Sequence, residues 1–245
     1  MKILTVSDLH LRTPLYQELA TAVALHKPDV ICVIGDWLDW GDMRSDMLDP
    51  IQAALKLAEM AKGREIVFVR GNHEADRFPL FEFTWRTTGQ VGHFLHGSAI
   101  NIGGLSIIGF PCQMGDADCY AKGRPLPSDH YETWLIRLMR ETGVASRGLW
   151  LAHEPPCLAL SEGWLSCPEW EDAIWQFQPA AFVSGHDHTT PLKTGVWQHR
   201  IGRTICVNAG QRVWPHPRRL LYCTMRFRFD GDGTPHLLGG IERHG

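Results

Sequence analysis

The chain has 245 residues, of which 44% are apolar and 21% are charged, the size of one large α/β or all-β domain or of two small ones. Its 24 Lys and Arg residues against 27 Asp and Glu residues give a net charge of −3. This balance excludes a general polycation that coats nucleic acid or an anionic membrane by bulk charge. The composition also excludes disorder as the main state of the chain.

Membrane insertion and a disulfide framework are not expected. Apolar runs such as residues 30–35 fall far short of the ~20 residues that span a bilayer, and Ser7-Asp8 comes too early for the apolar region of a signal peptide. We therefore expect a cytoplasmic protein with no membrane partner. The seven cysteines are odd in number and contain no C-x-x-C pair, so reduced and mostly buried thiols are expected.

Strand and helix signals alternate along the first part of the chain. Strands are predicted over Lys2–Val6, Val30–Ile34 and Glu65–Val69. Between them, Thr13-Pro14 and Asp49-Pro50 each place a capping residue before a proline, and amphipathic stretches follow as far as Pro28 and Gly63. This order of strand, helix and strand is typical of α/β proteins with parallel strands.

The pattern changes after residue 98. Residues 99–102 and 105–108 flank Gly103-Gly104 with the spacing of a hairpin, which implies a second sheet or an extension of the first. Asp129 and Glu132 resemble a capping box that opens a helix ending at Gly143. Further strands are expected over 149–152 and 181–184, and the stretch 204–229 is strand-like. Without repeats or linkers, we expect one domain over residues 1–245, with irregular insertions at about 111–130 and 155–180.

Five of the predicted strands are each followed at once by residues that can ligate a metal or move a proton. These residues are Asp8 and His10, Asp36 and Asp39, Asn72 and His73, His153, and His186 and His188. Ligands bind outside the carboxyl ends of the strands in open α/β sheets, so the five loops should converge on one edge. Each residue alone could be an ordinary loop residue, but one site explains all five loops.

The types of these residues restrict the metal. Carboxylates, imidazoles and an amide without cysteine suit Mn, Fe, Zn or Co rather than a thiolate site. The ligands are too numerous for one tetrahedral zinc, so a two-metal site is favoured. Two divalent ions remain net positive after two aspartates and a bridging hydroxide, and phosphate esters are the obvious anions for such a centre.

The loops contain five short motifs, Asp8-Leu9-His10, Gly35-Asp36-Trp37-Leu38-Asp39, Gly71-Asn72-His73-Glu74, His153 and Gly185-His186-Asp187-His188. In type and order they resemble the motif set of the calcineurin-like metallophosphoesterases. The resemblance covers nearly the whole chain, because residues 207–211 resemble a turn that often follows the last ligands. It implies an α/β fold with two stacked mixed β-sheets flanked by helices, and a binuclear metal centre at the sheet edge.

The resemblance also implies a role for each residue. One divalent ion would be held by Asp8, His10, Asp36 and His188, and the other by Asp36, Asn72, His153 and His186. The ions would be Mn, Fe or Zn, with Mn favoured for activity. His73 would be the acid or the electrophile beside the leaving-group oxygen, oriented by a hydrogen bond to Asp39, while a metal-bridging hydroxide attacks phosphorus in line.

Three more residues are candidates for substrate binding. Arg70 makes the third motif resemble the Ser/Thr protein phosphatases and the dinucleoside polyphosphate hydrolases, in which that arginine grips phosphate. The first motif is instead more similar to the bacterial repair nucleases and the lipid A precursor hydrolases. Trp37 and Trp40 could stack on an aryl or nucleobase leaving group, or could cap the core beneath the second motif.

Metal-dependent hydrolysis of phosphate esters is therefore expected, with a phosphodiesterase acting on a small organic or nucleotide substrate favoured. A phosphomonoesterase or nucleotidase and a DNA-processing nuclease are the alternatives, and a non-catalytic scaffold of the same fold is least favoured. Residues 199–230 contain seven arginines and one acid, a pattern typical of a solvated strand face and less often of a nucleic-acid groove. Nucleic acid is thus a weaker candidate partner, and no feature of the sequence indicates an oligomeric state.

Overall fold

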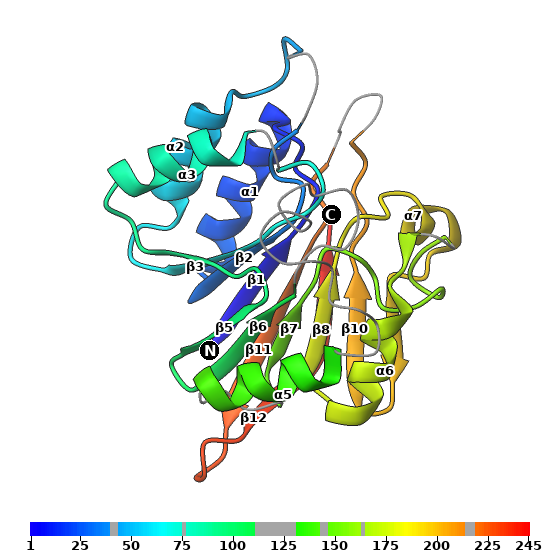
Figure 1. Cartoon of the computed structure of the whole chain (residues 1–245). Helices are drawn as coiled ribbons and strands as arrows, with labels where there is room; N and C mark the ends of the chain where they lie inside the picture. Colours follow the sequence, from blue (N-terminus) through cyan, green and yellow to red (C-terminus); the bar gives the residue numbers. More distant parts are fainter. Residues whose placement is uncertain (40–43, 75–76, 111–130, 143–146, 163–164, 214–218) are drawn as a thin grey trace.

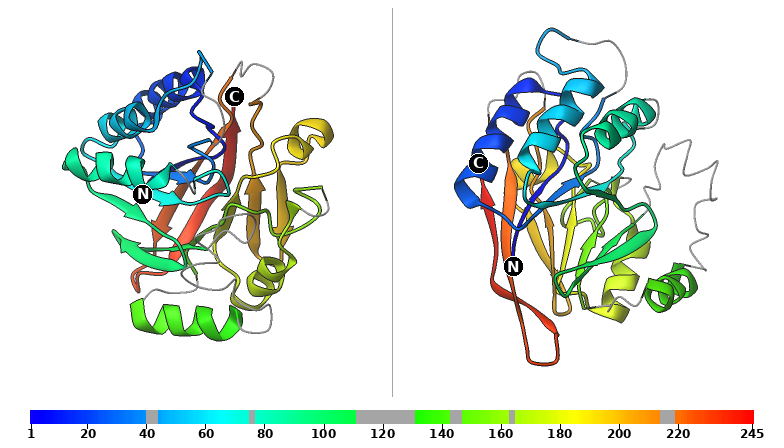
Figure 2. Two further views of the ribbon diagram at one scale, coloured as in Figure 1. Left: turned by 45° about the horizontal axis from the view of Figure 1, so that its top comes forward. Right: turned by 90° about the vertical axis from the view of Figure 1, so that its left-hand side faces the viewer.

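Two six-stranded mixed β-sheets lie face to face in the computed structural model, and helices cover the outer face of each sheet (Figure 1, Figure 2). The structure describes the chain except for residues 40–43, 75–76, 111–130, 143–146, 163–164 and 214–218. The layers are helix, sheet, sheet and helix. The prediction of an α/β fold with two stacked mixed sheets flanked by helices is confirmed.

The first sheet has the strand order β12-β11-β1-β2-β3-β4. Its strands are β1 (Lys2–Val6), β2 (Val30–Ile34), β3 (Glu65–Val69), β4 (Gly92–Phe94), β11 (Tyr222–Phe229) and β12 (Pro235–His244). The strands from β1 to β4 are parallel, whereas β11 and β12 add antiparallel edges. The structure matches the predicted bounds of β1, β2 and β3, because their mainly apolar runs suit strands buried on both faces.

The second sheet has the strand order β5-β6-β7-β8-β10-β9. Its strands are β5 (Ser98–Ile102), β6 (Leu105–Gly109), β7 (Leu149–Leu151), β8 (Ala181–Ser184), β9 (Gln198–Ile201) and β10 (Thr204–Asn208). The strands β6, β7, β8 and β10 are parallel, and β5 and β9 are antiparallel edges. The predicted hairpin around Gly103-Gly104 is therefore confirmed as β5 and β6.

Helices that cover the first sheet are α1 (Thr13–His26), α2 (Pro50–Met60) and α3 (Phe78–Thr87), and the other helices are α5 (Tyr131–Thr142), α6 (Pro168–Phe177) and α7 (Thr190–Thr194). The predicted start of α2 is confirmed, since Asp49 and Gln52 cap each other as a capping box. The prediction for residues 155–180 was partly wrong, because α6 forms there from a proline at its first turn and a buried stripe that includes Trp170 and Ile174. The predicted insertion at 111–130 and Asp129 lie outside the described residues.

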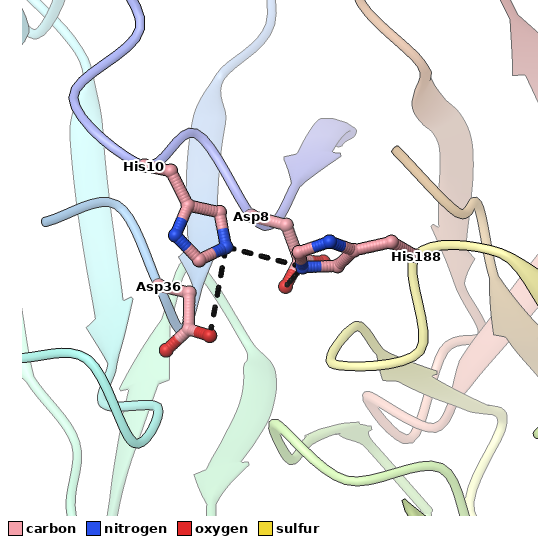
Figure 3. Close-up of side chains that lie close together, drawn as sticks. All are labelled: Asp8, His10, Asp36 and His188. Atoms are coloured by element: carbon pink, nitrogen blue, oxygen red, sulfur yellow. Dashed lines mark hydrogen bonds and ion pairs between the residues drawn. The ribbon is translucent and has the colours of Figure 1, made fainter. Parts of the chain in front are cut away.

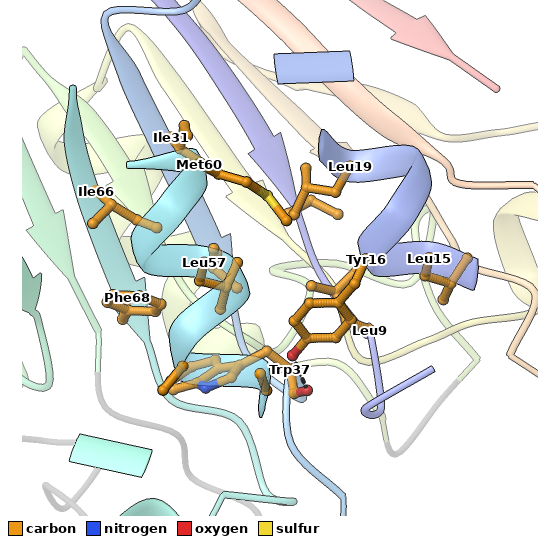
Figure 4. Close-up of a cluster of buried hydrophobic side chains, with 14 of the residues drawn as sticks. Leu9, Leu15, Tyr16, Leu19, Ile31, Trp37, Leu57, Met60, Ile66 and Phe68 are labelled. Carbon is orange, nitrogen blue, oxygen red and sulfur yellow. Dashed lines mark hydrogen bonds between the residues drawn. The ribbon is translucent and has the colours of Figure 1, made fainter. Parts of the chain in front are cut away.

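Three apolar clusters hold the layers together. One lies between α1 to α3 and the first sheet and includes Tyr16, Leu57 and Phe68 (Figure 4). The second fills the space between the sheets, and the third joins the second sheet to α5 and α6. The strands are thus fixed on both faces, so the loops that leave them start from rigid positions.

The cysteine prediction holds for the described residues, in which the free and buried thiols are Cys32, Cys157, Cys167, Cys206 and Cys223. The remaining two, Cys112 and Cys119, lie outside the described residues. Among the helices that the structure describes, none combines the length and the apolar composition needed to cross a bilayer.

Candidate metal centre

The carboxyl ends of β1, β2, β3, β7 and β8 meet at one edge of the two sheets. The first three are neighbours in the first sheet and the last two are neighbours in the second. A hydrogen bond joins the two sheets here. The backbone N–H of His186, which follows β8, donates to Oδ1 of Asp8, which follows β1, at 3.2 Å. The predicted convergence of the five loops on one edge is therefore present.

Four of the predicted ligands form one group, with one ligand atom from each lying within 4.8 Å of the others. They are Asp8, His10, Asp36 and His188, and Figure 3 shows their polar atoms turned toward one another. Nε2 of His188 lies 3.1 Å from Nε2 of His10 and 3.2 Å from Oδ1 of Asp8. His10 Nε2 lies 3.7 Å from Asp36 Oδ2.

A second group shares Asp36 with the first. It consists of Asp36, His153 and His186, again within 4.8 Å of one another. His153 Nε2 lies 3.2 Å from Asp36 Oδ2, 3.2 Å from His186 Nδ1 and 3.2 Å from Asn72 Oδ1. The structure thus brings together all seven residues predicted to hold metals, in two groups joined at Asp36.

The chemistry of these groups fits divalent cations. Ring nitrogens of His10 and His188 face each other, and so do those of His153 and His186, an arrangement that a cation between each pair would satisfy. Asp8 and Asp36 are 0% and 2% exposed, and buried carboxylates need paired cations or metals. Oxygen and imidazole donors without sulfur suit Mn, Fe or Zn.

The buried carboxylates and imidazoles of the cluster shift each other's pKa values. Burial opposes ionisation of Asp36, but the neighbouring His153 and His10 hold its pKa well below the usual range. Burial lowers the pKa of His153, and the charge of Asp36 outweighs it and raises that pKa to about 10. A metal ligand must be a neutral imidazole, so cation binding here would release a proton from His153.

His73 lies beside the cluster and is held by Asp39. Its Nδ1 is 2.8 Å from Asp39 Oδ1, and its Nε2 is 3.8 Å from Asp36 Oδ2. Burial lowers the pKa of His73, but the hydrogen bond to Asp39 and the charge of Asp36 raise it above 6.5 overall. The same Asp39 oxygen lies 3.6 Å from His10 Nδ1, so one carboxylate faces both imidazoles.

The backbone around the cluster is strained. Of the seven non-glycine residues with positive φ in the described ranges, five lie in these loops: Asp8, His10, Leu11, Asp36 and His186. Such conformations cost about 1–3 kcal/mol each and gather at functional sites. Glycines allow the close packing, because a Cβ on Gly35 would overlap the His153 ring and one on Gly71 would overlap Asp36 Oδ1. The structure therefore explains why glycine stands directly before Asp36 and before Asn72.

Glu74 is a buried residue of the site whose role sequence reasoning missed. Its carboxyl accepts the backbone N–H groups of Asp36 and Leu38 at 3.0 Å and of Gly71 at 2.6 Å. Burial and the charge of Asp36 raise the pKa of Glu74 to about 8. Its place in the third motif was visible, but no spacing rule indicates a return contact to residues 36–38. Glu74 thus joins the loop of the shared ligand to the loop of Asn72 and His73.

The candidates for substrate binding lie in different surroundings. Of the two roles expected for Trp37, the structure shows the position in the core and not the one stacked on a substrate, because its side chain is 0% exposed and packs against Phe68, Phe78 and Phe81. Trp40 lies outside the described residues. Arg70 is half-buried, with its guanidinium carbon 3.8 Å from the centre of the Phe78 ring.

Comparisons with known proteins identify the family. The calcineurin-like phosphoesterase family matches residues 1–190, and the chain belongs to this family, whose members depend on a binuclear metal centre. No curated protein matches the sequence.

Solved structures share the fold at low sequence identity. A protein of Thermus thermophilus is 14% identical with a TM-score of 0.65, covering 99% of this chain and 97% of that one. A dimetal phosphatase from Danio rerio is 12% identical with a TM-score of 0.53, covering 92% of both chains. An archaeal phosphodiesterase is 10% identical with a TM-score of 0.52, covering 100% of this chain and 99% of that one.

Proposed function

We propose that this protein is a metal-dependent phosphodiesterase that acts on a small organic or nucleotide substrate. The observation that supports it best is the pair of ligand groups joined at Asp36, with His73 beside them. Two divalent ions bound by these groups would supply an activated water as the nucleophile and positive charge for the phosphate oxygens. The other parts of the reaction fall to side chains of the chain itself.

His73 is the proton donor in this proposal. Asp39 occupies Nδ1 of His73, so Nε2 is the nitrogen that faces the cluster and can donate a proton to the leaving-group oxygen. The hydrogen bond to Asp39 and the charge of Asp36 outweigh burial and raise the pKa of His73, which favours the protonated form that can donate. Asp39 holds the ring in the orientation that donation requires.

The positively charged side chains near the cluster favour a diester substrate over a monoester. A diester carries one negative charge, whereas a monoester carries up to two and needs more positive charge around it. In the described part of the motif loops, Arg12 is buried against Asp46 at 2.5 Å and Arg70 lies over Phe78. Both arginines therefore already have protein contacts.

Arg70 is nevertheless the residue that favours the second candidate function, a phosphomonoesterase, because it follows β3 directly and is only partly buried.

Parallel assays on bis-p-nitrophenyl phosphate and p-nitrophenyl phosphate, with and without Mn²⁺, test the proposal. We expect Mn²⁺-dependent turnover with preference for the diester, and loss of turnover in Asp36→Asn. The exposed Asp172 on α6 offers a matched control, Asp172→Asn, which should keep full activity. Preference for the monoester would favour the second candidate, and no turnover of either ester would overturn the enzymatic proposal.

A further inference from the structure

A pocket of about 580 Å³ lies away from the metal centre and is lined by three arginines. Arg147 precedes β7, and Arg200 and Arg203 come from the hairpin of β9 and β10. The opposite wall comes from the start of β12, which includes His236. None of the described lining residues is acidic.

The pocket lies at the far end of the strands from the metal centre. The residues Pro179 and Ala180 in its wall come just before β8, whereas His186 follows the carboxyl end of that strand. The six residue-to-residue steps from Ala180 to His186 span up to about 20 Å at ~3.3 Å per step. Arg147 and Arg203 likewise precede the parallel strands β7 and β10 (Figure 1). A ligand in the pocket would therefore not touch the metal ligands.

The three guanidinium groups have no carboxylate partner among the described residues. The ion pairs of the structure include other arginines, such as Arg228 with Asp230 at 3.7 Å, but not these three. Asp230 Oδ2 lies 2.7 Å from Nε2 of the lining residue His236, so this carboxylate is paired with His236 and Arg228 rather than with the three arginines. Like charges around one concave surface repel each other unless an anion balances them.

Hydrogen bonds fix part of the lining of the pocket in place. Gln178 accepts the backbone N–H of Arg203 at 2.6 Å and donates to Ile174 O at 2.9 Å, which fixes the hairpin turn to the end of α6. Arg200 Nη1 donates to the carbonyl of Arg203 at 3.2 Å, which orients its side chain along the turn. The side chain of Arg200 and the backbone of Arg203 are thus held in place at this pocket, and both residues belong to the basic stretch 199–230.

We propose that this pocket is a second anion site, which binds a small phosphate-bearing ligand such as a diphosphate group. Guanidinium groups match phosphate oxygens by paired hydrogen bonds, and three of them suit a ligand with two or more negative charges. The diphosphate can come from inorganic pyrophosphate or from a nucleotide. Binding here requires no metal.

Calorimetric titration of the full chain with pyrophosphate and with ADP, in chelator, tests the site. We expect both to bind, and to bind equally well to Asp36→Asn. The double variant Arg200→Ala/Arg203→Ala should bind at least about tenfold more weakly, as should Arg147→Gln. The exposed Arg226 on β11 lies outside the pocket, so Arg226→Ala is the matched control and should change affinity less than about twofold. Unchanged thermal unfolding of each variant verifies its fold.

The outcomes separate this site from its alternatives. Tighter binding of ADP than of pyrophosphate indicates a nucleotide as the source of the diphosphate, and equal binding indicates the diphosphate alone; either supports the site. Equal weakening by Arg226→Ala would show diffuse attraction and overturn it. Loss of binding in Asp36→Asn or in chelator would assign the anion to the metal centre. Binding of a short single-stranded oligonucleotide without binding of either small anion would overturn it in favour of a nucleic-acid surface.

Discussion

Replacing Trp37 tests whether this side chain belongs to the core or to the substrate site. The ring is 0% exposed, and its centroid lies 5.3 Å from that of Phe68 and 5.7 Å from that of Phe81. Truncation of a buried tryptophan to alanine costs about 3–5 kcal/mol, since it removes apolar contacts and leaves a cavity. For a chain of this length that corresponds to a drop of roughly 6–20 °C in melting temperature.

Trp37→Phe is the more informative variant. The Nε1 of Trp37 is buried and makes no hydrogen bond in the described structure, so its removal leaves no partner unpaired. Removing an unpaired buried N–H group offsets part of the lost packing. We therefore expect Trp37→Phe to lower the free energy of unfolding by less than about 1.5 kcal/mol, a smaller loss than in Trp37→Ala.

Urea unfolding and steady-state kinetics on the two p-nitrophenyl phosphate esters together decide the role of Trp37. We expect a large loss of stability in Trp37→Ala and an unchanged KM in Trp37→Phe. Phe83, which is 68% exposed on the neighbouring α3, provides the control Phe83→Ala, which should shift stability by less than about 0.5 kcal/mol. Unchanged stability in Trp37→Ala together with a tenfold higher KM would refute the burial argument and restore the stacking role.

Three further predictions concern the surroundings of the cluster and the first sheet. Asp39→Asn should lower kcat about 10- to 100-fold, and more for a poor leaving group than for p-nitrophenol, because His73 loses its orienting carboxylate; an equal loss on both would contradict proton donation. Glu74→Ala should lower the free energy of unfolding by at least about 2 kcal/mol in urea titrations, because three buried N–H groups lose their acceptor; wild-type stability would contradict it. Burial and the nearby His244 and Lys2 lower the pKa of His26 from 6.5, so its stabilising contribution is complete above that pH and is lost as the pH falls below it. The melting temperature of His26→Gln should accordingly fall less than that of the wild type between pH 7.5 and 5.5. An equal fall of the melting temperature in both proteins would show that His26 is not involved.

The sequence predicted the parts of the fold that depend on local signals. Mainly apolar runs marked β1, β2 and β3, and Asp49-Pro50 marked the start of α2. Edge strands were harder to predict, because β4 has only three residues and β12 is interrupted by Gly239-Gly240. Their pairing depends on neighbours that are distant in the chain, and a single sequence does not show such neighbours.

The site, like the fold, was predictable where local sequence signals decide and not where contacts between distant segments decide. The placement of metal-ligating residues after the strands predicted which side chains converge, because parallel strands deliver their carboxyl ends to one edge. The contacts of Glu74 with residues 36–38 and the burial of Trp37 depend on the tertiary path of the second and third motifs. The arginine pocket likewise joins Arg147 to a hairpin more than fifty residues later, which the basic stretch 199–230 alone did not indicate.

The most direct test of a two-metal phosphodiesterase centre is the number of Mn²⁺ ions that one chain binds, measured by equilibrium dialysis of the wild type, Asp36→Asn and the control Asp172→Asn. We expect two ions per chain in the wild type and in the control. Asp36→Asn should lose affinity for both ions, because Asp36 belongs to both ligand groups. Fewer than one ion in the wild type, or unchanged binding of both ions in Asp36→Asn, would contradict the binuclear centre on which the proposed function depends.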